Sequence, residues 1–135
     1  EGLTPELNTH QLLAYLPRIA QLCHCEFCID ITSMTLAARS GSQDKLLAVA
    51  DWRSSTLFSE KERLALAYAE AATQTPPAVD DALRSAMAAH FGARALTELT
   101  ALIGLQNLSA RFNAAMAIPA QGLCQIPTSS SQNKE

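Results

Sequence analysis

Residues 21–30 read Gln-Leu-Cys-His-Cys-Glu-Phe-Cys-Ile-Asp and place three cysteines within six positions. Two of these cysteines, Cys25 and Cys28, are separated by two residues. Residues i and i+3 are neighbours on one face of a helix, so two sulfur atoms at this spacing can form a disulfide with little backbone movement. If Cys25 lies at the helix start, exposed N–H groups and the helix dipole stabilise its thiolate, which is the nucleophile. The stretch predicts a redox-active pair on a helix that begins near Cys25.

The same cysteines have other interpretations. Free cysteine is often a small buried residue without chemistry. A structural zinc site would need more distant ligands, and outside the cluster the chain offers only Cys124, His10 and His90. A thioredoxin-like site would need a βαβ unit, and the chain has no credible strands. We therefore expect thiol chemistry without a metal or other cofactor, with Cys23 as an alternative disulfide partner or a bystander.

Outward from this stretch, apolar spacing, caps and prolines predict an all-α fold. Ser59 and Glu62 form a capping box, Asp80 caps the next helix, and Gly92 is expected to stop that helix after Phe91. The first expected helix runs over about 9–22, and Pro17 is expected to kink or split it. The other expected helices run over about 25–40, 43–51, 60–75, 81–91 and 93–117, and a connector spans 52–58.

Composition sets limits on the class of protein. The 135 residues suit one domain, here residues 1–127, followed by a disordered tail over 128–135. Charged residues make up only 17%, which suggests that an oligomer covers some surface. The net charge of −3, without any Lys/Arg run, disfavours nucleic-acid binding. No apolar stretch approaches the roughly 20 residues of a membrane span, and the acidic, polar start lacks a signal peptide, so we expect a cytoplasmic protein.

The order of several motifs resembles the alkylhydroperoxidase D (AhpD) branch of the carboxymuconolactone decarboxylase family. In that branch a helix runs into Cys-x-x-Cys, as residues 13–24 do here, with Arg18, Ile19, Gln21 and Leu22 in register. Residues 50–59 are similar to the connector of the family and residues 62–71 to its central helix. Motifs at 89–92, 96–100 and 110–113 follow in order, so the resemblance covers about Leu13 to Pro127.

The resemblance implies a compact AhpD-like helical domain that assembles as a homo-oligomer, either a trimer or a dimer/hexamer. It also implies an antioxidant enzyme, a peroxiredoxin-type alkylhydroperoxidase or disulfide oxidoreductase that uses Cys25 and Cys28. The substrate would be an organic hydroperoxide or a disulfide, and a dithiol reductant would supply electrons. The alternative is a non-catalytic oligomeric redox sensor or a relic of the family.

Two departures from the family pattern concern the proton relay. The family has a His four residues after the second cysteine, where this chain has Thr32, and a Glu twelve residues before the first, where it has Leu13. Such acid–base assistance is worth about 10²–10⁴-fold in rate, so the peroxidase mechanism is expected to be weakened, rewired or lost.

Four nearby groups are candidates to replace the relay. His24 adjoins Cys25 and titrates near neutrality, or it is a surface imidazole without a role. Glu70 is expected to be a buried carboxylate with a raised pKa, or a satisfied structural acid. Glu26 and Asp30 are further candidates, with a helix-dipole acid and a solvated face as their alternatives. The four relay candidates are thus His24, Glu26, Asp30 and Glu70. Separately, on the last helix, Arg111 and Asn113 are expected to form a buried polar pair or a subunit contact.

Overall fold

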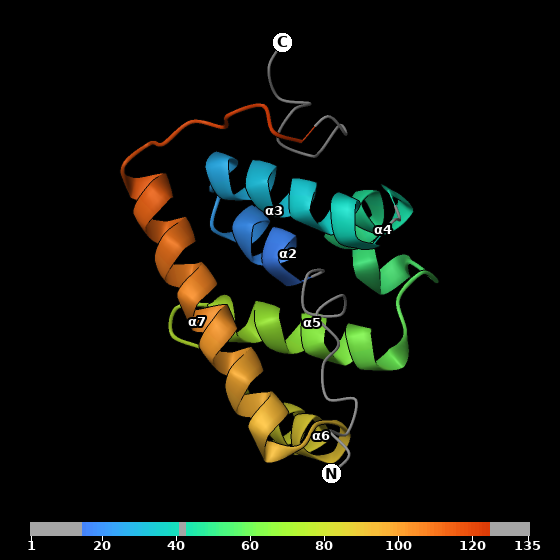
Figure 1. The fold of residues 1–135 in the computed structure, drawn as a ribbon. Helices are drawn as coiled ribbons and strands as arrows, with labels where there is room; N and C mark the ends of the chain where they lie inside the picture. Colours follow the sequence, from blue (N-terminus) through green and yellow to red (C-terminus); the bar gives the residue numbers. More distant parts are fainter. Residues whose placement is uncertain (1–14, 41–42, 125–135) are drawn as a thin grey trace.

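The structure, a computed structural model, describes residues 15–40 and 43–124 (Figure 1). Every regular element in these two ranges is helical, which confirms the predicted all-α fold. Residues 9–14 of the first predicted helix, Leu13 among them, and the predicted tail lie outside the described residues. The elements are α2 (Tyr15–Leu22), α3 (Glu26–Ser40), α4 (Gln43–Ala48), the 3-10 helix η1 (Val49–Ser54), α5 (Glu60–Thr73), α6 (Asp81–His90) and α7 (Ala93–Ala115).

Helix α2 is the central element, because it contacts α3, α5, α7 and η1. In Figure 1, α3 and α5 lie on opposite sides of α2, α7 runs along the bundle past both, and α6 lies at one end beside the start of α7. Pro17 is the third described residue of α2 and is buried. The kink or split predicted at Pro17 concerns a helix over about 9–22 whose first part lies outside the described residues, so it stays a prediction. None of the helices in the described ranges is both long and apolar enough to cross a membrane.

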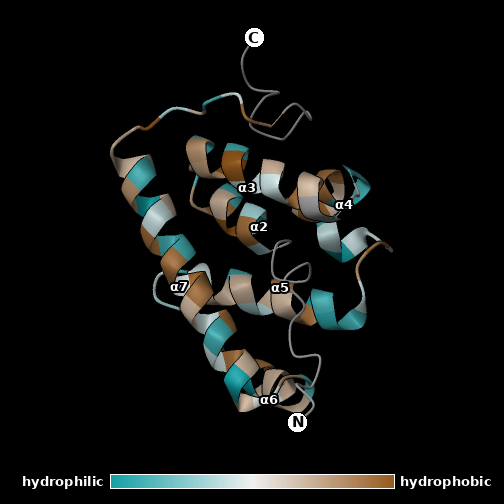
Figure 2. Ribbon diagram, in the orientation of Figure 1, coloured by the Kyte–Doolittle hydropathy of each residue, from teal (hydrophilic) through white to brown (hydrophobic). Residues whose placement is uncertain are grey.

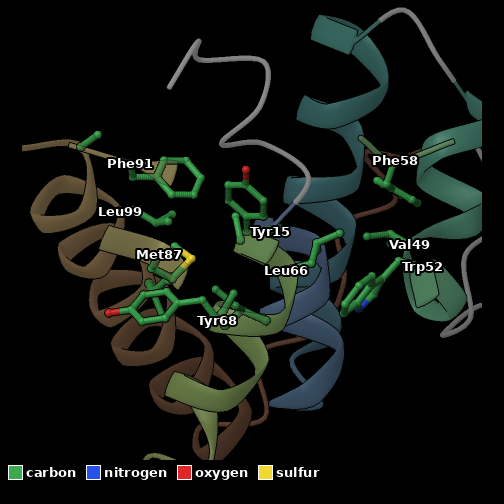
Figure 3. Packing of buried hydrophobic residues seen from close by; sticks show 14 residues of the cluster. Tyr15, Val49, Trp52, Phe58, Leu66, Tyr68, Met87, Phe91 and Leu99 are labelled. Carbon is green, nitrogen blue, oxygen red and sulfur yellow. The ribbon is translucent and has the colours of Figure 1, made fainter. Parts of the chain in front are cut away.

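The main hydrophobic core joins α2 to η1, α5, α6 and α7 (Figure 3). Each fully buried aliphatic or aromatic side chain contributes roughly 1.5–3 kcal/mol to folding. The cluster also contains Trp52 and Phe58, which anchor the connector as expected. The residues labelled in Figure 3 are Tyr15, Val49, Trp52, Phe58, Leu66, Tyr68, Met87, Phe91 and Leu99.

Side-chain caps define the starts of α5 and α6. The Ser59 side chain accepts a hydrogen bond from the Glu62 N–H, and the Glu62 carboxylate accepts one from the Ser59 N–H, which confirms the capping box. Asp80 caps α6 as predicted. The expectation for Gly92 was wrong: its φ of −66° is not the left-handed conformation of a C-terminal stop, and Gly92 is the N-cap of α7.

The predicted third helix, residues 43–51, is α4 followed by the 3-10 turns of η1, which reach Ser54. A kink at Asp51 (φ −114°, ψ 36°) interrupts η1. The guanidinium of Arg63 on α5 holds the end of this segment by donating hydrogen bonds to three carbonyl oxygens, those of Trp52 at 3.0 Å, Arg53 at 2.7 Å and Ser55 at 2.9 Å. The connector is thus fixed to α5 by one side chain.

The segment after α7 returns across α3 and is held there by Asp30 (Figure 1). The Asp30 carboxylate accepts hydrogen bonds from the backbone N–H groups of Gln121 at 3.0 Å, Leu123 at 2.9 Å and Cys124 at 2.7 Å. Asp30 is only 8% exposed, which excludes the solvated-face interpretation. Burial opposes its ionisation, but the N–H groups of residues 121–124 outweigh burial and lower the pKa of Asp30 below its ordinary value.

We predict that Asp30→Asn lowers the free energy of unfolding by about 2 kcal/mol, because charge-assisted hydrogen bonds to three N–H groups are lost. A depressed native-state pKa stabilises the fold above the unfolded-state pKa of about 3.9. The difference between wild type and variant is therefore complete at neutral pH and shrinks as the pH falls below about 4. Urea melts across this range measure it.

The matched control is Glu98→Gln, which removes an exposed i,i+4 ion pair with Arg94. Such pairs are worth about 0.5 kcal/mol or less, so this variant should unfold almost like wild type. Equal losses in the two variants would contradict a special role for Asp30.

Candidate functional site

The turn between α2 and α3 sets the position of the cysteines. The Cys25 N–H donates to the Ala20 carbonyl at 3.1 Å, and the His24 N–H donates to the Gln21 carbonyl at 3.1 Å. These are the two bonds of a Schellman motif, in which the residue at the His24 position adopts the left-handed conformation. The φ of His24 is indeed +53°. Cys25 then packs on Ala20, as the hydrophobic contact of this motif requires.

Cys25 immediately precedes α3 and caps its N-terminus with sulfur. Its Sγ accepts a hydrogen bond from the backbone N–H of Cys28 at 3.1 Å, in the place of a serine or aspartate oxygen. The two sulfur-bearing side chains belong to the same buried cluster, with Ala20, Ile29 and Ala110. The predicted pair therefore exists as two neighbouring thiols in the first turn of α3.

Cys25 and Cys28 are each only 1% exposed. Burial, with a side-chain hydrogen bond to Cys28, raises the pKa of Cys25 to about 12, although the Cys28 N–H opposes the change. The expectation that the helix start lowers the Cys25 pKa was therefore wrong. Removal from water dominates over the dipole and a single backbone donor here.

Helix α7 supplies a polar contact to the second cysteine. The Asn113 amide nitrogen lies 3.6 Å from Cys28 Sγ and donates to it. The Thr32 hydroxyl, at the position of the family's relay histidine, donates instead to the Cys28 carbonyl at 2.6 Å. The Thr32 hydroxyl is therefore bonded to the backbone of its own helix, whereas the Asn113 side chain contacts the Cys28 sulfur.

Cys23 lies on the other side of the His24 turn, half-buried, and packs against the cluster that holds Cys25 and Cys28. Its sulfur lies 3.7 Å from the side-chain oxygen of Asn107 on α7. Burial raises the pKa of Cys23 and the charge of Arg111 opposes that change. Cys23 also lines a cavity of about 370 Å³, within the usual range for small-molecule sites, whose walls are Leu22, Cys23, Glu70, Thr73, Gln74 and Arg111.

Glu70 borders this cavity but is held firmly by other groups. Its carboxylate accepts hydrogen bonds from Arg18 at 2.6 Å, from the Trp52 indole at 2.9 Å and from Arg53 at 2.6 Å. Burial alone would raise the pKa of Glu70, but these three donors outweigh it and lower the pKa. The expectation of a raised pKa was therefore wrong, and Glu70 is an ionised structural acid.

Two other candidate helpers, His24 and Glu26, are not buried with the sulfur atoms. His24 is exposed on its turn, and Glu26 is an exposed acid in the first turn of α3. Arg111 and Asn113 do not form the expected pair. Arg111 donates to the Thr73 carbonyl at 2.7 Å, whereas Asn113 contacts Cys28. Their partners lie 38 and 85 residues away in the sequence and could not be read from spacing along the helix.

In the described residues, no group of three or more His, Cys, Asp and Glu side chains is arranged to hold a metal ion. The site consists of a buried dithiol on α3, a third thiol before the turn, and polar side chains from α7. Such an arrangement can exchange electrons through sulfur.

Comparison with known proteins agrees with this description. The family model named "Carboxymuconolactone decarboxylase family" matches residues 13–71, which contain α2, both pair cysteines and most of α5. Over this part of its length the chain resembles the carboxymuconolactone decarboxylase family. Members of this family include enzymes.

A curated relative is the uncharacterized protein YnjA of Escherichia coli (strain K12), which is 78% identical over 110 residues. The match covers 82% of this chain but only 60% of YnjA, so this chain spans less than two thirds of that relative.

Solved structures share the fold at lower identity. The debrominase Bmp8 is 24% identical, with a TM-score of 0.80, and the match covers 87% of this chain and 63% of Bmp8. A protein of unknown function from Agrobacterium tumefaciens, described as a candidate antioxidant defence protein AhpD, is 22% identical, with a TM-score of 0.78. That match covers 84% of this chain and 79% of the other. At these identities the likeness shows the fold of the family alone.

We predict that His24→Gly leaves stability unchanged or raises it by up to about 1 kcal/mol, because glycine adopts the left-handed conformation without a Cβ penalty but loses more entropy on folding. His24→Val should lower stability, because a β-branched residue is strained there. Thermal melts of the two variants check the turn. If His24→Gly retains stability but slows oxidation of the Cys25–Cys28 pair, the imidazole takes part in the chemistry.

Proposed function

We propose that this protein is a thiol-dependent peroxidase or disulfide oxidoreductase in which Cys25 and Cys28 cycle between dithiol and disulfide. The observation that carries the proposal is the hydrogen-bonded pair of thiols at the start of α3. A hydroperoxide ROOH accepts two electrons and two protons from the pair, which gives a disulfide, an alcohol and water. A dithiol donor then returns two electrons and two protons and leaves as its own disulfide.

Cys28 is the better candidate for the attacking thiol. Its sulfur accepts a hydrogen bond from the Asn113 amide, so a polar side chain of α7 lies beside it. Burial raises the pKa of Cys25 to about 12, so Cys25 is the weaker candidate for the first attack and takes the resolving role, in which it attacks an already oxidised sulfur. In this order Cys28 takes the oxygen as a sulfenic acid, and Cys25 displaces water to close the disulfide.

The alternative is a redox sensor that is oxidised without useful turnover. Two observations favour it: both sulfur atoms are buried, and the family's relay histidine is replaced by Thr32, whose hydroxyl is engaged by the backbone. Asn113 can donate a hydrogen bond but cannot supply a proton to a leaving oxygen. A slow catalyst and a sensor differ in turnover, which the first experiment below measures.

We also infer that the chain assembles with copies of itself through the exposed face of α7. Four large apolar residues, Leu105, Leu108, Phe112 and Met116, recur at helical spacing and are 60–67% exposed. Figure 2 shows hydrophobic residues recurring along the length of α7. A contiguous apolar strip of this kind on a soluble surface marks an interface, and the low charge content of the chain fits a covered face.

Cys28→Ser and Cys25→Ser should each abolish consumption of an organic hydroperoxide in the presence of a dithiol, because neither variant can form the intramolecular disulfide. Cys25→Ser keeps a side chain that is favoured at a helix N-cap, so its loss of activity cannot be ascribed to unfolding. Asn113→Leu should slow the reaction, because the Cys28 sulfur loses its donor.

Cys124→Ser is the control, because Cys124 packs against Leu36 and Leu46 rather than the pair. Stoichiometric oxidation of wild type without turnover would select the sensor. If Cys25 and Cys28 of the wild type never form a disulfide, both the enzyme and the redox-sensor functions are refuted.

Leu108→Glu should dissociate the oligomer, because a charge in the apolar strip loses its hydration in the interface. Light scattering should then give the 14.5 kDa of one chain, while circular dichroism stays helical. The matched control is Leu47→Glu on α4, which is also exposed (56%) but lies off the strip. A wild type that is already monomeric at micromolar concentration would contradict the interface.

A further inference from the structure

The cavity described above is lined by the thiol of Cys23, which is not part of the Cys25–Cys28 pair. Its walls include Cys23, whereas Cys25 and Cys28 are each 1% exposed and do not line it. A dithiol donor or a disulfide substrate has to bring a sulfur atom into line with a protein sulfur. The buried pair therefore needs an intermediary, and Cys23 packs against both the pair and the cavity.

We propose that Cys23 is a third redox cysteine that exchanges disulfides between a substrate in the cavity and the buried Cys25–Cys28 pair. The inference rests on the proposed function, since it requires a pair that forms a disulfide. It adds a site, the cavity between α2, α5 and α7, and a role for a cysteine outside the Cys-x-x-Cys motif.

In the reductive direction the exchange balances in three steps. The Cys23 thiolate attacks Cys28 Sγ of the Cys25–Cys28 disulfide, which forms a Cys23–Cys28 disulfide and releases Cys25 as a thiolate that takes up a proton. A donor thiolate in the cavity attacks Cys23 and releases Cys28. The second donor thiolate then closes the donor disulfide and releases Cys23. Two electrons and two protons pass from donor to pair, and each step forms one S–S bond and breaks one.

The turn supports this exchange. Cys23 and Cys25 flank His24, whose left-handed φ of +53° reverses the chain between α2 and α3. Within the described part of the chain, the Cys23 thiol makes one long hydrogen-bond contact, of 3.7 Å to the Asn107 side-chain oxygen. A negative charge on Cys28 would raise the pKa of Cys23.

The charges around the cavity indicate the class of substrate. Arg111 lines it, donates to the Thr73 carbonyl and to Asn107, and has no carboxylate partner among residues 15–40 and 43–124. The carboxylate of Glu70 is already shared by Arg18 and Arg53. The net local charge is positive, so the cavity favours a thiol or disulfide that carries an anionic group, such as a carboxylate.

The test uses reduced full-length chain and the dianionic aromatic disulfide 5,5′-dithiobis(2-nitrobenzoate). Cys23 should release one thionitrobenzoate and form a mixed disulfide, and Cys28 should then displace the second. Cys23→Ser should slow the first release by about tenfold or more, since the remaining pair is buried. In Cys25→Ser, peptide mapping should find the reaction stopped at a Cys23–Cys28 disulfide.

Arg111→Gln should slow the reaction with this reagent by about fivefold, which is the rate effect of losing one partly exposed charge pair. The same variant should barely change the rate of reaction with the neutral reagent 4,4′-dithiodipyridine. Cys124→Ser is the matched control and should react like wild type in the first phase. Cys23→Ala, with thermal melts of every variant, separates loss of the thiol from loss of the fold.

The outcomes distinguish this inference from the proposed function. If Cys23→Ser forms the Cys25–Cys28 disulfide at the wild-type rate, and Cys25→Ser yields no Cys23–Cys28 disulfide, the role of Cys23 is refuted while the dithiol function stands. If wild type forms no Cys25–Cys28 disulfide with either reagent, both are refuted.

Discussion

The left-handed turn at His24 is the constraint on which the site depends. The two Schellman hydrogen bonds close α2, and the next residue, Cys25, opens α3 with its sulfur as the cap. One residue in an uncommon conformation therefore separates two helices and keeps Cys23 and Cys25 on either side of a sharp reversal. Because α2 is the element that α3, α5 and α7 all contact, the same turn connects the dithiol to the main core.

Burial and local donors compete at each ionisable group, and the outcome differs from group to group. Asp30 and Glu70 are both shielded from water, yet each receives at least three hydrogen bonds and stays ionised with a lowered pKa. Cys25 receives only one backbone donor, so burial prevails and its pKa rises to about 12. The number of donors decides these cases, and distance from the surface alone does not.

Periodicity and caps predict the helices well, because they depend on residues close in sequence. The capping box at Ser59, the cap at Asp80 and the spacing of Cys25 and Cys28 all appear as expected. Contacts between distant segments could not be predicted. Neither the bond from Asn113 to Cys28, 85 residues apart, nor the backbone N–H groups that surround Asp30 leave a trace in local sequence. The errors at Cys25 and Glu70 have the same origin, since the helix dipole and hydropathy say nothing about which partners arrive from elsewhere.

The hydrogen bond between Glu70 and the Trp52 indole has a consequence for fluorescence. The sequence contains a single tryptophan, and its indole N–H donates to a Glu70 carboxylate oxygen at 2.9 Å, with the Arg53 guanidinium 4.3 Å from the ring centre. Glu70 is also part of the cavity wall that contains Cys23. An anion that enters the cavity changes the electric field at the indole, so the emission of Trp52 is an intrinsic fluorescent reporter of occupancy. Binding at this site can be followed by fluorescence without attaching a dye to any of the cysteines.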